Sequence, residues 1–403
     1  MQLRATSLRA IKNTALINAL TLADLWSAGQ LGLWYDASDM ATLFQDIAGA
    51  TPVTAVTQKA GRQLDKSGRA NHAYQATSAA RPEWSARVNL LTKTEDFTDA
   101  AWSVQGATKT TGIADPDGTN NAVRIAITSN IGINFNYPYA SLTGMPYSGG
   151  GMVKGNVGEQ IFFAVDGQTP QTLVTFTGGW QSVTNAQAAV AAGIAYWNFE
   201  IYNRAGGAHL PNVTFDVYKP SLNYGSVATR YQRVNTATDY DTVGFPFFLA
   251  LDGVDDSMST ASFAAGTLGA DMDCFIAVRR SSAAFALLLA DSNLAFFACL
   301  GPGDSGPTNV NAGSPSYVVN GLLVNSGAAI TRDQLAAAMP VGAWLILEIR
   351  NLNLSGFLSF GTSSYPGLPA RADIAQIVLA PAGDAAQRQR IRTYLGAKVG
   401  LTL

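Results

Sequence analysis

Aromatic residues between positions 88 and 235 could bind a sugar. An aromatic ring packs against the apolar C–H face of a pyranose, and Asn or Gln side chains beside it orient the hydroxyl groups. Trp180 is the best candidate because its surroundings, T-G-G-W-Q-S, predict a loop, and Trp102 and Tyr202 are further candidates. Trp197 alternates with polar neighbours in A-Y-W-N-F-E-I-Y-N, a pattern that favours a place in the core of a sheet.

Three aspartates could bind a metal ion. Asp252, Asp255 and Asp256 lie in L-D-G-V-D-D-S at the end of an expected strand, and their carboxylate oxygens are ligands that calcium prefers. Alternatively, Asp252 and Asp255 accept hydrogen bonds from backbone N–H groups of a tight turn at Gly253. We favour the turn, because the same pattern occurs in domains that only serve as scaffolds. No cofactor other than calcium is expected.

Other acidic residues favour structural roles over catalysis. Glu95, Asp96 and Asp99 suggest glycosidase chemistry, but that reaction needs two carboxylates held across a cleft at a defined separation. A turn before Trp102 is the simpler interpretation. The glycine run at 149–151 lacks the G-K-[ST] ending of a phosphate loop, and the G-x-S-x-G pattern of a serine nucleophile is absent. We therefore expect that the chain is not an enzyme.

The histidines and cysteines also predict structural roles. His72 shares a loop with Asp65 and Asn71, where it is expected to anchor the loop by hydrogen bonding. Cys274 and Cys299 each lie in an apolar, strand-like run, which favours two buried thiols over a disulfide. With two histidines and no C-x-x-C pair, the sequence does not predict a zinc site.

The composition indicates a folded, β-rich protein. Of 403 residues, 47% are hydrophobic but only 13% are charged, and 39 are glycine. This mixture suits short strands and tight turns, whereas helical bundles need charged outer faces. The net charge of −2, without a Lys/Arg block, argues against nucleic acid as a partner. No apolar run approaches the roughly 20 residues of a membrane span.

The spacing of apolar residues predicts helices and strands in several segments. Residues 1–29 predict a short helical arm, which either packs on the body or docks the chain onto a larger assembly. We do not favour a signal peptide there, because Asn and Asp interrupt the apolar stretch. Short strands separated by turn residues follow throughout 88–403, as in β-sandwiches. Helices are expected at 330–339 and 384–401.

Three motifs resemble a known family. The segments L-W-Y-D-A-S-D, L-D-K-S-G-R-A-N-H-A and L-D-G-V-D-D-S-M-S-T are similar to concanavalin A-like (laminin-G-like) lectin sandwiches of phage and bacterial surface proteins. The matching residues are Trp34, Asp36, Asp39, Asp65, Ser67, Gly68, Asn71, His72, Ala73, Asp252, Gly253, Asp255 and Asp256. Ala70 stands where the family usually has glycine. The C-terminal helix also resembles the family's closing helix, through Arg388, Ile391, Tyr394, Leu395, Lys398, Gly400 and Leu401.

The second and third motifs stand unusually far apart in this chain, with about 180 residues between His72 and Asp252. The segments N-L-L-T-K-T-E-D-F-T-D-A-A-W and A-T-R-Y-Q-R-V-N-T-A-T-D-Y-D bracket the extra stretch, which resembles a carbohydrate-binding-module-like jelly roll. We therefore predict a mainly β protein in which a lectin-like sandwich is interrupted by an inserted jelly roll. The predicted parts are an N-terminal helical docking arm (1–29), the first part of the lectin-like sandwich (30–87), the jelly roll (88–235), and the second part of the sandwich (236–403), which ends in a helix. Insertion at an exposed loop costs little.

The resemblance implies a structural and adhesion component of a tailed-phage virion: a tail fibre, a baseplate-associated fibre, or a head fibre or capsid decoration. Such a protein would be made in the host cytoplasm and would reside in the virion. The implied partners are other virion proteins, through residues 1–29, and a host-surface glycan, in a homo-oligomer and often a trimer. The alternatives are a soluble carbohydrate-binding lectin and, less favoured, a glycan depolymerase, whose usual repeats are absent from this sequence.

Overall fold

The computed structural model describes most of the chain. The described ranges are 22–26, 29–129, 133–165, 170–188, 192–261, 272–284, 286–291, 296–308, 315–325, 330–352, 358–361 and 370–403. The arm predicted over 1–29 therefore lies largely outside the described residues, and the part that is described contains the 3-10 helix η1 (Ala23–Trp26). The described residues form four antiparallel sheets and two α-helices, so the prediction of a mainly β protein is confirmed.

Two of the sheets take strands from both ends of the chain, and we call this pair the split sandwich. Sheet I has the order β22-β21-β23-β18-β25-β16-β5, with β1 also paired to β25, and sheet II has the order β2-β3-β4-β17-β24-β19-β20. The strands of sheet I are β1 (Leu33–Asp36), β5 (Glu83–Ser85), β16 (Phe248–Asp252), β18 (Met272–Arg280), β21 (Ser316–Val319), β22 (Leu322–Asn325), β23 (Trp344–Leu352) and β25 (Arg371–Pro381). Those of sheet II, which follow the 3-10 helix η2 (Met40–Thr42), are β2 (Leu43–Phe44), β3 (Arg62–Gln63), β4 (Ala73–Tyr74), β17 (Ser257–Thr260), β19 (Ala286–Asp291), β20 (Phe296–Leu300) and β24 (Leu358–Gly361).

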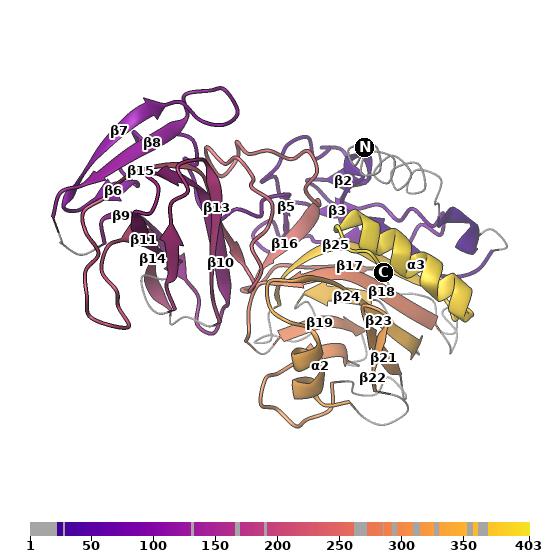
Figure 1. Ribbon diagram of the computed structural model, residues 1–403. Helices are drawn as coiled ribbons and strands as arrows, with labels where there is room; N and C mark the ends of the chain where they lie inside the picture. The colour runs from indigo at the N-terminus through magenta and orange to yellow at the C-terminus, as the bar shows by residue number, and fades with distance from the viewer. Residues whose placement is uncertain are drawn as a thin grey trace, which may run out of the picture.

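The other two sheets use only the middle of the chain, and we call this pair the inserted sandwich. Sheet III has the order β13-β10-β15-β8-β7, and sheet IV has the order β12-β11-β14-β9-β6. The strands are β6 (Ser103–Val104), β7 (Ala107–Ile113), β8 (Ala122–Ile127), β9 (Phe135–Ser141), β10 (Tyr147–Gly155), β11 (Gln160–Ala164), β12 (Thr172–Thr175), β13 (Gln181–Gln187), β14 (Gly193–Glu200) and β15 (Thr214–Tyr224). Figure 1 shows the inserted sandwich beside the split sandwich.

Each sandwich has its own hydrophobic core. Sheets I and II bury Ile276 and Phe360 between them, together with many neighbouring aliphatic side chains. Sheets III and IV bury an aromatic core around Trp197, whose indole nitrogen donates to the Gly150 carbonyl at 3.3 Å. The glycine run at 149–151 lies in β10, where a Cβ at Gly149 would come within 3.2 Å of the Trp197 ring. The run therefore makes room for an indole inside the core.

Two α-helices complete the split sandwich. Helix α2 (Arg332–Ala338) is capped by Thr331, whose side chain accepts a hydrogen bond from the backbone N–H of Gln334. Helix α3 (Ala385–Lys398) is capped by Asp384, and its apolar side chains pack against residues of sheet I. Figure 1 shows the helix lying along that sheet. Both helices were predicted, because the capping residues and the apolar spacing are visible in the sequence.

The two sandwiches meet at a close backbone contact. Gly225 follows β15 and lies against Gly342, which precedes β23. A Cβ at Gly342 would lie 2.5 Å from the carbonyl carbon of Tyr224 and closer still to Gly225. Val341 packs against the core of the inserted sandwich. The two units therefore touch through main chain and buried apolar side chains.

The two cysteines, Cys274 and Cys299, are both buried and free, as predicted. Among the described residues, no helix is both long and apolar enough to span a bilayer.

Candidate functional site

Trp180 lies at the surface of the inserted sandwich. It occupies the loop between β12 and β13, as the sequence predicted, and its side chain is half-buried. Its ring stands edge-on to Tyr218 of β15, with the ring centroids 6.2 Å apart. Because Tyr218 itself is buried, Trp180 is the member of this pair that presents a ring to solvent.

A β-bulge beside Tyr218 places a lysine next to these rings. The pairing of β10 with β15 shifts between Gly150 and Met152, and Lys219 adopts a left-handed backbone conformation with φ of 51°. This conformation is costly for a residue with a side chain, and a bulge redirects the side chain that carries it. The Lys219 ammonium lies 5.2 Å from the ring centroid of Tyr218 and 5.6 Å from that of Tyr231.

The lysine also fixes a carboxylate at this surface. Lys219 Nζ lies 2.6 Å from Asp117 Oδ2, and the Tyr218 hydroxyl donates to the same oxygen at 3.2 Å. Asp117 is exposed, in the loop between β7 and β8. The lysine therefore links two aromatic rings to an acceptor group that solvent can reach.

A pocket of about 390 Å³ opens at this point. Its lining combines aromatic rings with charged and hydroxyl groups: Glu95, Asp117, Lys219, Arg230, Tyr231, Asp241, Thr242, Val243 and Phe245. The size falls within the roughly 300–1,000 Å³ typical of small-molecule sites. We call this the Tyr231 pocket.

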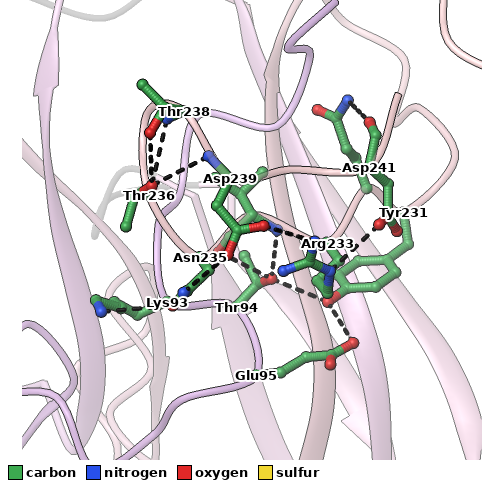
Figure 2. A network of polar contacts seen from close by, with 12 residues as sticks. Lys93, Thr94, Glu95, Tyr231, Arg233, Asn235, Thr236, Thr238, Asp239 and Asp241 are labelled. Atoms are coloured by element: carbon green, nitrogen blue, oxygen red, sulfur yellow. Dashed lines mark hydrogen bonds and ion pairs between the residues drawn. The ribbon is translucent and has the colours of Figure 1, made fainter. Parts of the chain in front are cut away.

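The back of the Tyr231 pocket is a fixed chain of hydroxyl and carboxylate groups (Figure 2). The Tyr231 hydroxyl lies 2.9 Å from Thr94 Oγ1 and donates to Glu95 Oε1 at 3.0 Å. Asn121 Nδ2 donates to the other Glu95 oxygen at 3.2 Å. Burial raises the pKa of Tyr231, so its hydroxyl stays protonated at neutral pH and serves as the donor.

An arginine with two carboxylate partners holds the adjoining loop in place. Arg233 binds Asp239 at 2.8 Å and Asp241 at 3.2 Å, and Asn235 Nδ2 donates to Asp239 at 3.0 Å (Figure 2). Hydrogen bonding to Arg233 lowers the pKa of Asp239 below its usual value. These contacts are exposed, so they position the loop of Asp241 more than they stabilise the fold.

Trp102 does not belong to this surface, so the prediction that it binds sugar is wrong. Only 1% of the residue is exposed, and its ring packs against Phe135, Tyr137 and Trp197 in the core. Its indole nitrogen donates to the Lys93 carbonyl at 2.9 Å. The buried position leaves no ring face for a ligand. Trp197 is fully buried, as the alternation predicted.

Tyr202 lies in a different part of the inserted sandwich. It is half-buried just after β14 of sheet IV, and its ring lies 4.9 Å from that of His209. In the described part of the chain, no contact joins it to Trp180 or to the Tyr231 pocket. The structure thus brings only Trp180 of the three predicted aromatics close to this pocket.

The three aspartates lie together at the end of β16. Their carboxylate oxygens lie within 4.8 Å of one another. Asp252 Oδ1 accepts from the backbone N–H groups of Val254 and Asp255, at 2.8 and 3.4 Å. Asp256 is buried, accepts from the Asp252 N–H at 3.1 Å and lies 3.5 Å from Lys59 Nζ. The turn predicted at Asp252 is confirmed, and Asp256 takes the capping role predicted for Asp255. Calcium binding stays a prediction.

The loop of His72 is an anchor, as predicted. Asp65 accepts from the backbone N–H groups of Trp34 and Asn71, at 2.8 and 3.0 Å. The Asp65 N–H donates to His72 Nδ1 at 2.9 Å, and Asn71 Nδ2 donates to the Gly32 carbonyl at 2.7 Å. Burial lowers the pKa of His72, so the neutral ring accepts this hydrogen bond.

Sequence reasoning missed most of the residues around Trp180. Tyr218 and Lys219 stand in a strand pattern, and only the bulge brings Lys219 to the pocket. Tyr231 and Asp241 lie in the segment that closes the inserted sandwich, far along the chain from Glu95. A polar, aromatic-containing segment at a domain boundary is the one signal in the sequence that could have indicated them.

Comparison with known proteins shows limited similarity. No protein-family model matches the sequence, and no curated protein matches it. A structure described as "CBM4 structure and function" is 15% identical, covers 36% of this chain and 88% of its own, and has a TM-score of 0.21. The N-terminal CBM22-1-CBM22-2 tandem domain from Paenibacillus barcinonensis Xyn10C is 9% identical, covers 73% of this chain and 98% of its own, and has a TM-score of 0.23. Similarity at this level carries no argument about ligand.

Proposed function

We propose that this chain is a non-catalytic carbohydrate-binding protein that holds a glycan at Trp180 and the Tyr231 pocket. The observation that supports this proposal most is a series of contacts: the ring of Trp180 contacts that of Tyr218, and Lys219 lies over the rings of both Tyr218 and Tyr231. The half-buried indole offers a stacking surface for a sugar ring, and the pocket beside it offers both donors and acceptors for hydroxyl groups.

The charged groups of the Tyr231 pocket favour binding over catalysis. Both Glu95 oxygens accept hydrogen bonds from neighbouring side chains, and Asp117 is paired with Lys219. Carboxylates held in this way orient hydroxyl groups. A glycosidase needs instead one protonated and one ionised carboxyl group across the scissile bond.

We further propose that the protein is a surface appendage of a tailed-phage virion, such as a tail fibre or a head fibre, and that it works as a homo-oligomer. This proposal is supported by the motifs around Trp34, Asn71 and Asp252 that resemble phage lectin sandwiches. In this proposal, residues 1–29 attach the chain to other virion proteins. Labelling intact virions with an antibody to the chain and viewing them by electron microscopy tests it, and unlabelled particles would contradict it.

The binding proposal is tested with a glycan array and with titration calorimetry on the array's hits. Trp180→Ala should abolish specific binding or weaken it at least tenfold, because the stacking surface is lost. Ile194→Ala is the matched control, since Ile194 is an exposed apolar residue on sheet IV and not part of the Tyr231 pocket. A blank array for the parent chain, or equal binding by the Trp180 variant, would count against the proposal.

A further inference from the structure

A second cavity lies between the two sandwiches. It has a volume of about 400 Å³ and shares no lining residue with the Tyr231 pocket. Sheet I supplies one wall, which includes Arg279, Arg371 and Asp373, and the inserted sandwich with its entry segment supplies the other, which includes Arg87, Tyr139 and Tyr224. We call it the interdomain cleft.

The sheet I wall carries an arginine that the fold does not neutralise. Arg279 is already paired, because it lies 2.7 Å from Asp373, its cross-strand neighbour. Arg371 stands opposite Asp252 in the pairing of β16 with β25. No carboxylate among the described residues lies within ion-pair distance of Arg371, and Asp252 uses Oδ1 to cap its own turn.

The facing wall carries a second arginine of the same kind. Arg87 donates to the carbonyls of Asn89 and Leu90 at 2.8 and 2.7 Å, and no described carboxylate pairs with it. Burial lowers the pKa of Arg87 more than the nearby Glu83 carboxylate raises it. Tyr224 lies close to both arginines, and its hydroxyl makes no described hydrogen bond. Its pKa is raised by burial, so it is a donor at neutral pH.

The charges in the cleft sum to a net positive site. Three arginines line it (Arg87, Arg279 and Arg371), against two aspartates (Asp252 and Asp373). Arg279 and Asp373 neutralise each other, which leaves two positive charges and one negative charge. An anion that entered the cleft would face two guanidinium groups and a phenol hydroxyl, all of them donors, against the one carboxylate of Asp252.

We propose that the interdomain cleft binds the carboxylate of an acidic sugar residue, a uronic acid, between Arg87, Arg371 and Tyr224. A planar carboxylate matches the fork of a guanidinium group. The cleft is also much larger than a bare anion needs, so it has room for a sugar ring. The rings of Tyr224, Tyr139 and Phe248 give the cleft an apolar surface against which that sugar can pack. The proposal is independent of Trp180, which lies outside the cleft.

Titration calorimetry with a matched pair of ligands tests the proposal. The pair is a galacturonic acid trisaccharide and the same trisaccharide with its carboxyl groups reduced. The parent chain should bind the acidic form at least tenfold more tightly than the neutral form. Arg371→Gln should weaken binding of the acidic form about tenfold or more, as expected when one charge-assisted hydrogen bond is lost. Arg390→Gln, on α3 and outside the cleft, should leave the affinity unchanged.

Three further measurements distinguish uronate binding in the cleft from misfolding of the variant, from binding at the Tyr231 pocket and from general anion binding. Thermal melting should show that Arg371→Gln folds normally, since no described ion pair is lost. Trp180→Ala should retain uronate binding, so failure of the Tyr231 pocket proposal would leave this one standing. Equal affinity for both trisaccharides, no effect of Arg371→Gln, loss of binding in Trp180→Ala, or inorganic phosphate bound as tightly as the acidic trisaccharide would each overturn it.

Discussion

Asn89 and Gln232 hydrogen-bond to each other where the chain enters and leaves the inserted sandwich. Asn89 Nδ2 donates to the Gln232 carbonyl at 3.0 Å, while the Asn89 N–H donates to Gln232 Oε1 at 3.1 Å. The two residues are 143 positions apart and both are buried. Gln232 Oε1 also accepts from the Val88 N–H, and its Nε2 donates to the Ala86 carbonyl. One amide therefore fastens the two crossings of the chain together.

Removal of the Gln232 amide should destabilise this junction strongly. Gln232→Ala would leave buried backbone groups of Ala86, Val88 and Asn89 without partners, at about 1–3 kcal/mol for each such group. We expect the free energy of unfolding to fall by about 3 kcal/mol or more in urea titrations. Gln181→Ala, whose amide makes exposed contacts, is the control and should change it by less than about 1 kcal/mol. Equal effects would contradict the role assigned to Gln232.

A methyl group at the contact between the sandwiches should force them apart. Gly342 has φ of 82° and its missing Cβ would overlap Gly225 and Tyr224. Gly342→Ala should therefore lower the stability by about 2 kcal/mol or more and raise the radius of gyration in X-ray scattering. Gly303→Ala has a similar φ of 75° with no atom near the added Cβ, so it measures the backbone cost alone. Identical results for the two variants would mean that the contact is not tight in solution.

The buried carboxyl group of Asp256 should make stability depend on pH. Burial raises the pKa of Asp256 to about 6, from 3.8 for an unburied aspartate. The folded state therefore binds a proton more tightly than the unfolded state, and the free energy of unfolding falls as pH rises from about 4 to 6. This contribution is about 2–3 kcal/mol. Asp256→Asn should remove it.

The measurement is urea unfolding between about pH 4 and 7.5, with the parent chain and the Asp256 variant compared at each pH. His72 has the opposite effect, because its lowered pKa makes stability fall as pH drops. Both proteins contain His72, so the difference between their profiles does not include this effect. Parallel profiles for the parent and Asp256→Asn would show that folding does not raise the pKa of Asp256.

Truncation of Trp102 should cost much more stability than truncation of Trp180. Trp102→Ala should cost about 3–5 kcal/mol of stability, because it empties a site in the aromatic core. Trp180→Ala should cost less than about 1 kcal/mol, because its ring is partly in solvent. Thermal melting of both variants checks this. A large loss of stability in the Trp180 variant would mean that the residue is structural.

The fold class could be predicted from the sequence because short strands and turns have a clear local pattern. Both α-helices could also be predicted, from their capping residues and apolar spacing. The central strand β25 could not, since both its faces are covered and its residues are almost all buried, so it lacks the alternation of an exposed strand.

The candidate sites were harder to predict, because they are assembled from distant segments. Trp180 could be found because the residues beside it in the sequence, T-G-G-W-Q-S, predict a loop, where an indole is seldom fully buried. Lys219 reaches the Tyr231 pocket through a bulge, and bulges depend on strand pairing. Arg87 and Arg371 line the same cleft only because an inserted unit docks on sheet I. No local pattern contains that information.

The pairing of β5 with β16 has an evolutionary consequence. Ser85 lies opposite Phe248, so the chain leaves sheet I and returns to it at adjacent strands. Any compact unit whose two ends are close together can be joined at that place without disturbing the remaining strands. The scaffold and the module that it displays can thus diverge at different rates. Recombination at this single border would exchange one inserted unit for another while the rest of the scaffold stays intact.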